Sequence, residues 1–323
     1  MSAPKSTPDR LCVSLPDTAS GERLDVVLAG LSGLSRSQVQ RLIRQGEVIL
    51  DGVVADRKVR VLGGERVELP VGSDVALDEE ADAAVKLQVV HQDADLFVID
   101  KPAGLVMHPA PGAPRGTVLN GLLALDPALR TLPRAGIVHR LDKDTTGLFV
   151  VARSARAFAS LTEQLQARTV RRRYQAVVVG TPVAGGTVDA PIGRHPVDRK
   201  RMAVRAGGRP AVTHYRVAER FRAHTVLDVS LETGRTHQIR VHMAHQRLPL
   251  VGDPVYGGRL RVPAGASTEL IDRLRDFPRQ ALHAVELSLV HPADAATHSW
   301  QSALPDDMRR LVDALAADTA VHR

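Results

Sequence analysis

The chain has 323 residues, more than a typical single domain, and its hydrophobic fraction of 44% is normal for a globular protein. Its net charge of +7 favours a polyanionic partner, because lysine and arginine displace condensed counterions from phosphates. No apolar run approaches the roughly 18 residues of a membrane span, residues 1–20 lack the apolar core of a secretory signal, and the lone Cys12 excludes an internal disulfide and a cysteine-based zinc site. We therefore expect a cytoplasmic protein.

The chain begins with a segment, residues 1–20, that mixes charge, proline and serine, and we expect it to be a flexible tail. A compact module is predicted over residues 21–70. Its first helix is indicated by apolar residues at helical spacing. These residues are Leu24, Val27, Leu28 and Leu31.

A second helix of this module begins at a capping box in which Ser35 is the N-cap and Gln38 the third helical residue. It is predicted to bury Val39, Leu42 and Ile43 and to end at Gly46. Short strands are expected over residues 48–50, 59–61 and 66–69.

Three arginines, Arg36, Arg41 and Arg44, are predicted to project from the other side of the second helix. Such a face is often merely solvated. Because further basic residues follow it, we favour an RNA-contacting surface. The stretch "LSRSQVQRLIRQGEVILDG" also resembles the α-L RNA-binding motif.

An acidic stretch, residues 71–86, is interpreted as a linker between domains. The large domain is predicted over residues 87–314, followed by a C-terminal tail over 315–323. Its strands come in adjacent pairs with occasional helices, which predicts an α+β fold with a predominantly antiparallel mixed sheet. Strands are expected over 89–90, 96–99, 147–152, 174–179 and 225–231, and a helix capped by Ser154.

The stretch "GIVHRLDKDTTGLFVVA" places a dense polar loop between two apolar segments. Asp142 lies between Arg140 and Lys143, and nearby cations favour an ionised carboxylate, which suits a nucleophile or an electrostatic stabiliser. The alternative is a turn stabilised by its own aspartates. A kinase catalytic loop is excluded, because the order of residues differs and no phosphate-binding glycine loop is present.

"HRLDKDTTGL" is similar to the signature of the RluA/RluD family of RNA pseudouridine synthases, most of all the RluD-type large-subunit ribosomal RNA enzymes. The resemblance covers roughly residues 20 to 312 and places the catalytic aspartate at Asp142. "RRRYQAVVVG" resembles the strand with the active-site tyrosine, here Tyr174, and "LETGRTHQIRVHMAH" resembles the block with the basic residue, here Arg240. "DLFVIDKPAGLVMHP", "VGDPVYGG" and "RQALHAVELSLVHP" also match in order, and Thr146 stands where the family often has serine.

The resemblance implies that a uridine is flipped out of structured RNA and isomerised in the site. Asp142 could attack C1′ of the sugar or C6 of the base, or assist elimination, and the sequence does not choose between these routes. Arg240 would keep the carboxylate charged. Tyr174 would pack its ring on the uracil and place its hydroxyl near C5, where a proton must leave. Arg140 would fill the vacated space or hold a phosphate. No cofactor is expected, and His237, His242 and His245 lack a ligand pattern, so no metal site is expected.

A mobile basic loop that includes Arg199, Lys200 and Arg201 is predicted to grip the RNA backbone. The expected partner is ribosomal RNA or a pre-ribosomal particle, with transfer RNA as an alternative, and the enzyme is expected to be a monomer. A non-catalytic ribosome-assembly protein would predict loss of the site residues, which are present. A glycoside hydrolase would need two facing carboxylates, and Lys143 separates Asp142 from Asp144.

Charge reversal at Arg36, Arg41 and Arg44 is predicted to weaken RNA binding and to reduce its salt dependence, because fewer counterions are released. Titration of RNA at several salt concentrations measures both quantities. An unchanged salt slope would indicate that this helix face is solvated and does not contact RNA.

Overall fold

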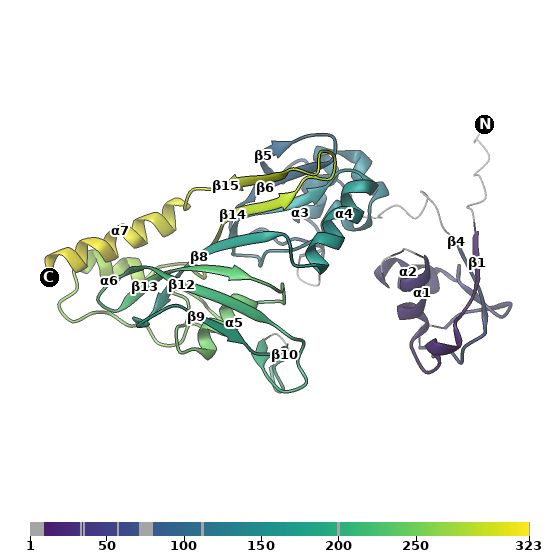
Figure 1. Cartoon of the computed structure of the whole chain (residues 1–323), viewed down its shortest axis with the longest axis horizontal. Coiled ribbons are helices and arrows are strands. Elements are labelled where there is room, and N and C mark those ends of the chain that lie inside the picture. The colour runs from purple at the N-terminus through teal and green to yellow at the C-terminus, as the bar shows by residue number, and fades with distance from the viewer. Residues whose placement is uncertain are drawn as a thin grey trace. The chain divides into compact units, whose positions relative to one another are not determined.

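The computed structural model describes residues 10–32, 34, 36–56, 58–70, 80–110, 113–198 and 201–322. The chain divides into two compact units, one formed by residues up to 78 together with 130–135, the other by 79–129 together with 136–323 (Figure 1). Each unit is described by itself. Among the described residues, no helix combines the length and apolar character needed to cross a bilayer.

The small unit contains a four-stranded antiparallel sheet in the order β1-β4-β2-β3. Its strands are β1 (Arg10–Ser14), β2 (Ile49–Leu50), β3 (Val53–Val54) and β4 (Arg66–Pro70). The flexible tail expected up to Ser20 is therefore too long, because Leu11 and Val13 alternate inward and pack against the core. The strand expected over 59–61 is wrong: only an isolated bridge joins Arg23 to Arg60, although Val61 is fully buried.

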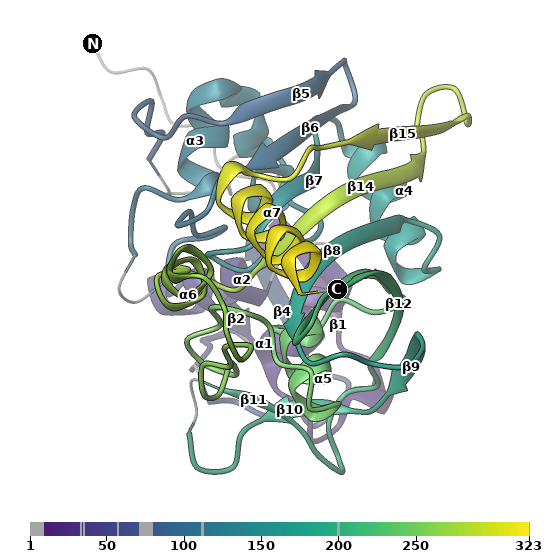
Figure 2. The same cartoon turned by 90° about the vertical axis from the view of Figure 1, so that its left-hand side faces the viewer.

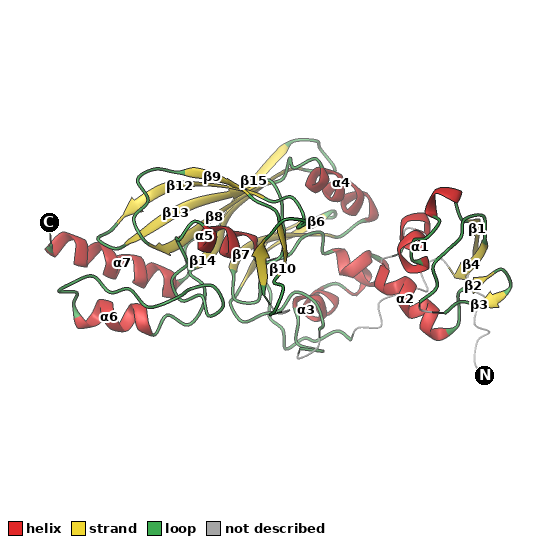
Figure 3. Ribbon diagram, turned by 90° about the horizontal axis from the view of Figure 1, so that it is seen from below, coloured by secondary structure: helices red, strands yellow, loops and turns green. Residues whose placement is uncertain are grey.

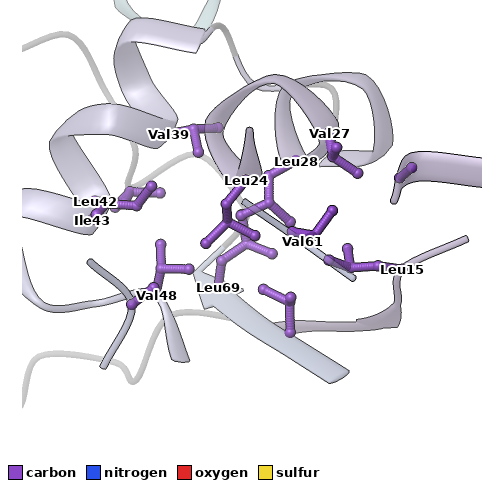
Figure 4. Packing of buried hydrophobic residues seen from close by; sticks show 13 residues of the cluster. Leu15, Leu24, Val27, Leu28, Val39, Leu42, Ile43, Val48, Val61 and Leu69 are labelled. Carbon is purple, nitrogen blue, oxygen red and sulfur yellow. The ribbon is translucent and has the colours of Figure 1, made fainter. Parts of the chain in front are cut away.

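Two helices, α1 (Leu24–Ser32) and α2 (Arg36–Gln45), cover this sheet, as the helical spacing predicted. Figure 4 shows their apolar side chains meeting those of the strands and loops. Leu31 is an exception, because it is exposed. Gly46 ends α2 in the left-handed region with φ 75°, which suits a residue without a side chain. The predicted N-cap Ser35 lies outside the described residues.

The basic face of α2 is only partly available for contact with a ligand, because one of its arginines pairs with a buried carboxylate. Arg36 donates a hydrogen bond from Nε to the Asp25 carboxylate at 2.8 Å, and Asp25 is buried in the first turn of α1. Arg41 is half-buried, whereas Arg44 is exposed. The three arginines therefore do not form one uniformly projecting row, because a buried carboxylate needs a cation nearby and takes Arg36 as a partner.

The large unit is built on a nine-stranded sheet with the order β5-β6-β7-β14-β8-β13-β12-β9, and β15 pairs with β14 (Figure 2). All of its strand pairs are antiparallel except β7 with β14, so the predicted α+β fold is confirmed. The strands are β5 (Gln88–Gln92), β6 (Leu96–Lys101), β7 (Thr146–Ala152), β8 (Arg171–Val179), β9 (Gly186–Asp189), β12 (Val212–Arg220), β13 (His224–Leu231), β14 (Leu282–Val290) and β15 (Thr297–Gln301).

Helices accompany this sheet, as Figure 3 shows in red. They are α3 (Val118–Leu125), α4 (Ala155–Gln166), α5 (Gln238–His245), α6 (Thr268–Arg275) and α7 (Asp306–Val321). A short 3-10 turn, η1 (Asp17–Ala19), belongs to the small unit, and η2 (Pro127–Thr131) and η3 (Pro133–Gly136) span the segment where the chain passes between the units. Ser154 caps α4, as predicted, by accepting a hydrogen bond from the Ala157 amide. The tail expected over 315–323 is instead largely helical. Its residue Leu315 lies on α7 and is buried in a cluster with residues of α6 and the sheet.

Two expected irregular segments also differ from the prediction. The second half of the acidic stretch packs on α3, where Asn120 donates to the Glu80 carbonyl at 2.7 Å; residues 71–79 lie outside the described part. The basic loop forms a hairpin of β10 (Ile192–Arg194) and β11 (Met202–Val204). Arg199 and Lys200 lie outside the described residues, so their predicted role has no structural description.

Candidate active site

The polar loop that precedes β7 carries Asp142, whose side chain is 15% exposed. Its Oδ2 accepts a hydrogen bond from Nη1 of Arg240 at 3.2 Å, although the two residues are 98 positions apart in the chain. Arg240 lies on α5 and its side chain is only 6% exposed. The structure therefore brings together the predicted carboxylate and the predicted cation.

A second carboxylate, Asp253, holds Arg240 from the other side. The guanidinium donates from Nε and Nη2 to its two oxygens at 2.7 and 2.9 Å. The Asp253 side chain is fully buried, and its Oδ1 also accepts the backbone amides of Val255 and Tyr256. Burial by itself would raise the pKa of Asp253, but Arg240 and these amides lower it overall, so the pair stays charged.

The ring of Tyr256 completes the support of Arg240, whose guanidinium carbon lies 5.1 Å from the ring centroid. The Tyr256 hydroxyl accepts the Met202 amide at 2.9 Å and lies 2.9 Å from Nδ1 of His237. Burial lowers the pKa of His237, which suits a neutral ring that accepts the hydroxyl proton. Because Arg201 also lies over Tyr256, at 5.4 Å, the β10–β11 hairpin is tied to this centre.

Tyr174 lies in the middle of β8, between Val229 of β13 and Ala284 of β14, and is almost fully buried. Burial raises the pKa of its hydroxyl, Arg172 opposes this change, and the negative charge of Asp142 adds to it. The phenol is therefore neutral around pH 7. Its electrostatic interaction with Asp142 places the third predicted residue near the other two.

The loop backbone after Asp142 is held by buried polar side chains from other parts of the unit. Each of four consecutive residues, 143–146, has one such partner. Lys101 donates to the Lys143 carbonyl at 2.7 Å, Arg279 to the Asp144 carbonyl at 3.1 Å, Gln280 to the Thr145 hydroxyl at 3.1 Å, and the Thr146 hydroxyl lies 2.8 Å from Nδ1 of His283. These contacts fix the direction in which the Asp142 side chain leaves the loop.

Lys101 is completely buried, and its ammonium uses all three protons on backbone carbonyls, including those of Pro102 at 2.8 Å and Leu105 at 3.0 Å. Burial lowers the pKa of Lys101 to about 7, although Asp144 and Asp142 counteract part of the effect. Arg279 is also buried and pairs through Nε and Nη2 with Asp307 of α7, at 2.7 and 2.8 Å.

A glycine makes the close strand contact behind the loop possible. Gly147 has φ 105°, and a Cβ atom there would lie 2.3 Å from the Ala284 carbonyl oxygen. Any side chain would therefore force β7 away from β14. The parallel pairing of these two strands depends on this position.

Among the other predicted residues, Arg140 is an exposed member of the same loop and lies within electrostatic range of His237, whereas Arg36, Arg41 and Arg44 belong to the small unit. His242 faces away, bonding the Thr213 hydroxyl and the Ala190 carbonyl, both at 2.9 Å.

Sequence reasoning missed Asp253, Tyr256, Lys101, Arg279 and Gln280. All five lie within blocks that carried the family resemblance, "VGDPVYGG", "DLFVIDKPAGLVMHP" and "RQALHAVELSLVHP". That resemblance gave no contact between blocks, so their partners could not be assigned.

Comparisons with known proteins give one consistent result. The family model described as RNA pseudouridylate synthase matches residues 95–245, and that of the S4 domain matches residues 22–67. The chain is 53% identical over 310 residues to ribosomal large subunit pseudouridine synthase D of Xanthomonas campestris pv. campestris, covering 95% of this chain and 92% of the relative. It is 50% identical over 319 residues to the protein of the same name from Escherichia coli (strain K12), covering 97% of each.

Solved structures agree. Human RNA pseudouridylate synthase domain containing 4 is similar with a TM-score of 0.55 and 27% identity, covering 71% of this chain and 93% of that one. Human RNA pseudouridylate synthase domain containing 1, at 24% identity and a TM-score of 0.52, covers 74% and 98% and shares the fold.

Replacement of Lys101 by methionine tests the buried ammonium. The folded pKa, about 7, lies below the unfolded value of 10.5, so the unfolded state binds more protons between these values and the free energy of unfolding rises with pH. From pH 7 to 9 the wild type is expected to gain about 2 kcal/mol relative to Lys101→Met. Chemical denaturation at each pH measures this difference.

The matched control is Lys86→Met, which removes an exposed lysine and should leave the pH dependence unchanged. If Lys101→Met and the wild type have the same pH dependence, the ammonium is not desolvated as described.

Proposed function

The chain belongs to the RNA pseudouridine synthase family, and we propose that it isomerises uridines of large-subunit ribosomal RNA with Asp142 as the catalytic carboxylate. The observation that carries the proposal is the Asp142–Arg240 pair, 3.2 Å between Oδ2 and Nη1, next to a buried Tyr174. The choice of RNA is supported by relatives at 50–53% identity that are named for the large ribosomal subunit. That substrate also suggests a cytoplasmic enzyme.

The reaction must break the bond between N1 of uracil and the sugar, turn the base and rejoin it through C5. Attack at C1′, attack at C6 and assisted elimination all require an ionised carboxylate. Asp142 is largely shielded from water, and a base that covers it removes more of its hydration, so its negative charge needs a cation beside it. Arg240 supplies that cation, and Asp253 prevents it from turning away.

Tyr174 is proposed to support the uracil ring while the base turns. Its pKa is raised by burial, so a phenolate is disfavoured and proton removal from C5 by Tyr174 would be costly near pH 7. The ring itself offers a flat apolar surface at the site. We therefore assign Tyr174 to packing and positioning of the base.

RNA binding is proposed to involve both units. Arg140 is exposed two residues from Asp142 and makes no ion pair within the described part of the chain, so it is free to enter the stack or hold a phosphate. The S4 domain, proposed to occupy residues 21–70 with Arg36, Arg41 and Arg44, would add electrostatic contacts that do not depend on sequence. The synthase domain is proposed over residues 87–314.

Asp142→Ala is expected to abolish pseudouridine formation while leaving RNA affinity within a few-fold of the wild type. The fold should survive, because Arg240 keeps both hydrogen bonds to Asp253. The measurement is pseudouridine mapping on an unmodified large-subunit ribosomal RNA transcript, with binding measured on the same RNA.

Asp144→Ala is a matched control, since Asp144 contributes its carbonyl to Arg279 and that carbonyl remains. Pseudouridine produced by Asp142→Ala would contradict the role of Asp142. Mapping of cellular RNA with and without the protein separates the substrates: modifications lost only from transfer RNA would contradict the ribosomal assignment.

Tyr174→Phe is expected to retain pseudouridine formation within about tenfold, since the ring and its packing are kept. Tyr174→Leu should reduce the turnover number much further. Single-turnover rates of both variants on the same transcript make the comparison. A Tyr174→Phe variant as inactive as Asp142→Ala would show that the hydroxyl takes part in proton transfer.

A further inference from the structure

Four lysine or arginine residues are buried in the described part of the chain: Lys101, Arg172, Arg240 and Arg279. Three of them have full sets of partners. Lys101 bonds three carbonyls, Arg240 pairs with two aspartates, and Arg279 pairs with Asp307 and backbone carbonyls. Arg172 differs, because its guanidinium makes no hydrogen bond or ion pair with any described residue.

This missing partner is costly for the free protein. Arg172 is 8% exposed, and its Nε is completely occluded without a hydrogen-bond partner. A buried guanidinium loses most of its hydration, and without a counter-charge that loss destabilises the fold. Only Nε is both completely occluded and without a partner. The two terminal nitrogens, Nη1 and Nη2, therefore remain accessible to an incoming group. An unsatisfied cation of this kind is expected where a ligand supplies the anion.

The position of Arg172 indicates which ligand that is. It lies on β8 two residues before Tyr174, so the two side chains project from the same face of the sheet. Its Nη1 would lie 3.1 Å from a Cβ atom at Gly234, in the segment that leads into α5 and Arg240. The lack of a side chain at Gly234 leaves room for the guanidinium at the edge of the site.

Among the described residues, no carboxylate forms an ion pair with Arg172. His139 lies within electrostatic range, but burial lowers its pKa to about 3, and Arg172 lowers it further, so the ring is uncharged at neutral pH. Tyr174 is also neutral, because its pKa is raised. These two groups within electrostatic range of Arg172 are thus uncharged, and neither supplies a counter-charge.

We propose that Arg172 binds a backbone phosphate of the RNA next to the uridine that enters the site. The proposal rests on the proposed function, since it takes the RNA to be docked at Asp142 and Tyr174. A phosphate supplies both the missing negative charge and two oxygens that match the guanidinium fork. A uracil carbonyl would supply an acceptor but would leave the buried charge uncompensated.

The test is Arg172→Met, which keeps an unbranched apolar side chain and removes the charge. The KM for an unmodified large-subunit ribosomal RNA transcript is expected to rise about tenfold or more. The slope of log KM against log salt concentration should fall by about 0.7 to 0.9, the value for one phosphate contact. The melting temperature of the free protein should rise or stay the same, because the uncompensated charge is gone.

Two variants provide matched comparisons. Arg171→Met removes the same charge from an exposed residue on the opposite face of β8, and its salt slope should equal that of the wild type. Arg172→Lys keeps the charge, so it should retain the wild-type salt slope with a smaller increase in KM. Gly234→Ala keeps every charge but crowds Nη1, and it should raise KM without changing the melting temperature of the free protein.

The salt slope decides the proposal. If the slope of Arg172→Met equals that of the wild type, no phosphate contact has been lost and the proposal is overturned, whether KM rises through a lost base contact or does not change. A lower melting temperature with an unchanged slope would make Arg172 a structural residue. A wild-type enzyme that leaves the transcript unmodified would instead refute the proposed substrate, so the two failures are distinguishable.

Discussion

The chain of charges Asp142–Arg240–Asp253 is the interaction on which the active site depends. Arg240 and Asp253 are both buried, and either one alone would cost about 3–5 kcal/mol, so each requires the other. Their pairing fixes the guanidinium before RNA arrives, and the remaining Nη1 then points at Asp142. The carboxylate meets a cation whose position is already set, which is the condition for electrostatic stabilisation without reorganisation.

This ion chain would be of little use on a mobile loop. The structure places the Asp142 loop over buried polar side chains from β6, from the segment before β14 and from β14 itself. These side chains form hydrogen bonds with the backbone and hydroxyl groups of 143–146. Because Arg279 also pairs with Asp307, the first turn of α7 belongs to the same network. Misplacement of a catalytic group by about 1 Å can cost on the order of a hundredfold in rate, so this rigid mounting suits the catalytic role proposed for Asp142.

The sequence could predict what depends on local pattern and on family resemblance. Alternating apolar residues predicted β13, helical spacing predicted α1 and α2, and the resemblance pointed to Asp142, Tyr174 and Arg240, which the structure brings together. It could not predict the partners of Lys101 or Arg279, because these contacts join residues as many as 135 positions apart. Local polarity also gave a wrong prediction for residues 315–323, which were expected to be a tail. Most of them belong to α7, because Leu315 packs in an apolar cluster with residues distant in the sequence.

The buried basic residues of the site divide into two kinds, and the difference follows from when their charge is needed. Lys101, Arg240 and Arg279 must hold the loop and the carboxylate in place in the free enzyme, so their partners are part of the chain. A buried cation that is to bind a phosphate does so best when it is unsatisfied until the RNA arrives, since a permanent counter-ion would compete with the phosphate. Folding tolerates an unpaired guanidinium at this position because the cost of desolvating it is offset by the apolar burial of a nine-stranded sheet. The lack of a partner at Arg172 is therefore consistent with a binding function and difficult to explain by a purely structural one.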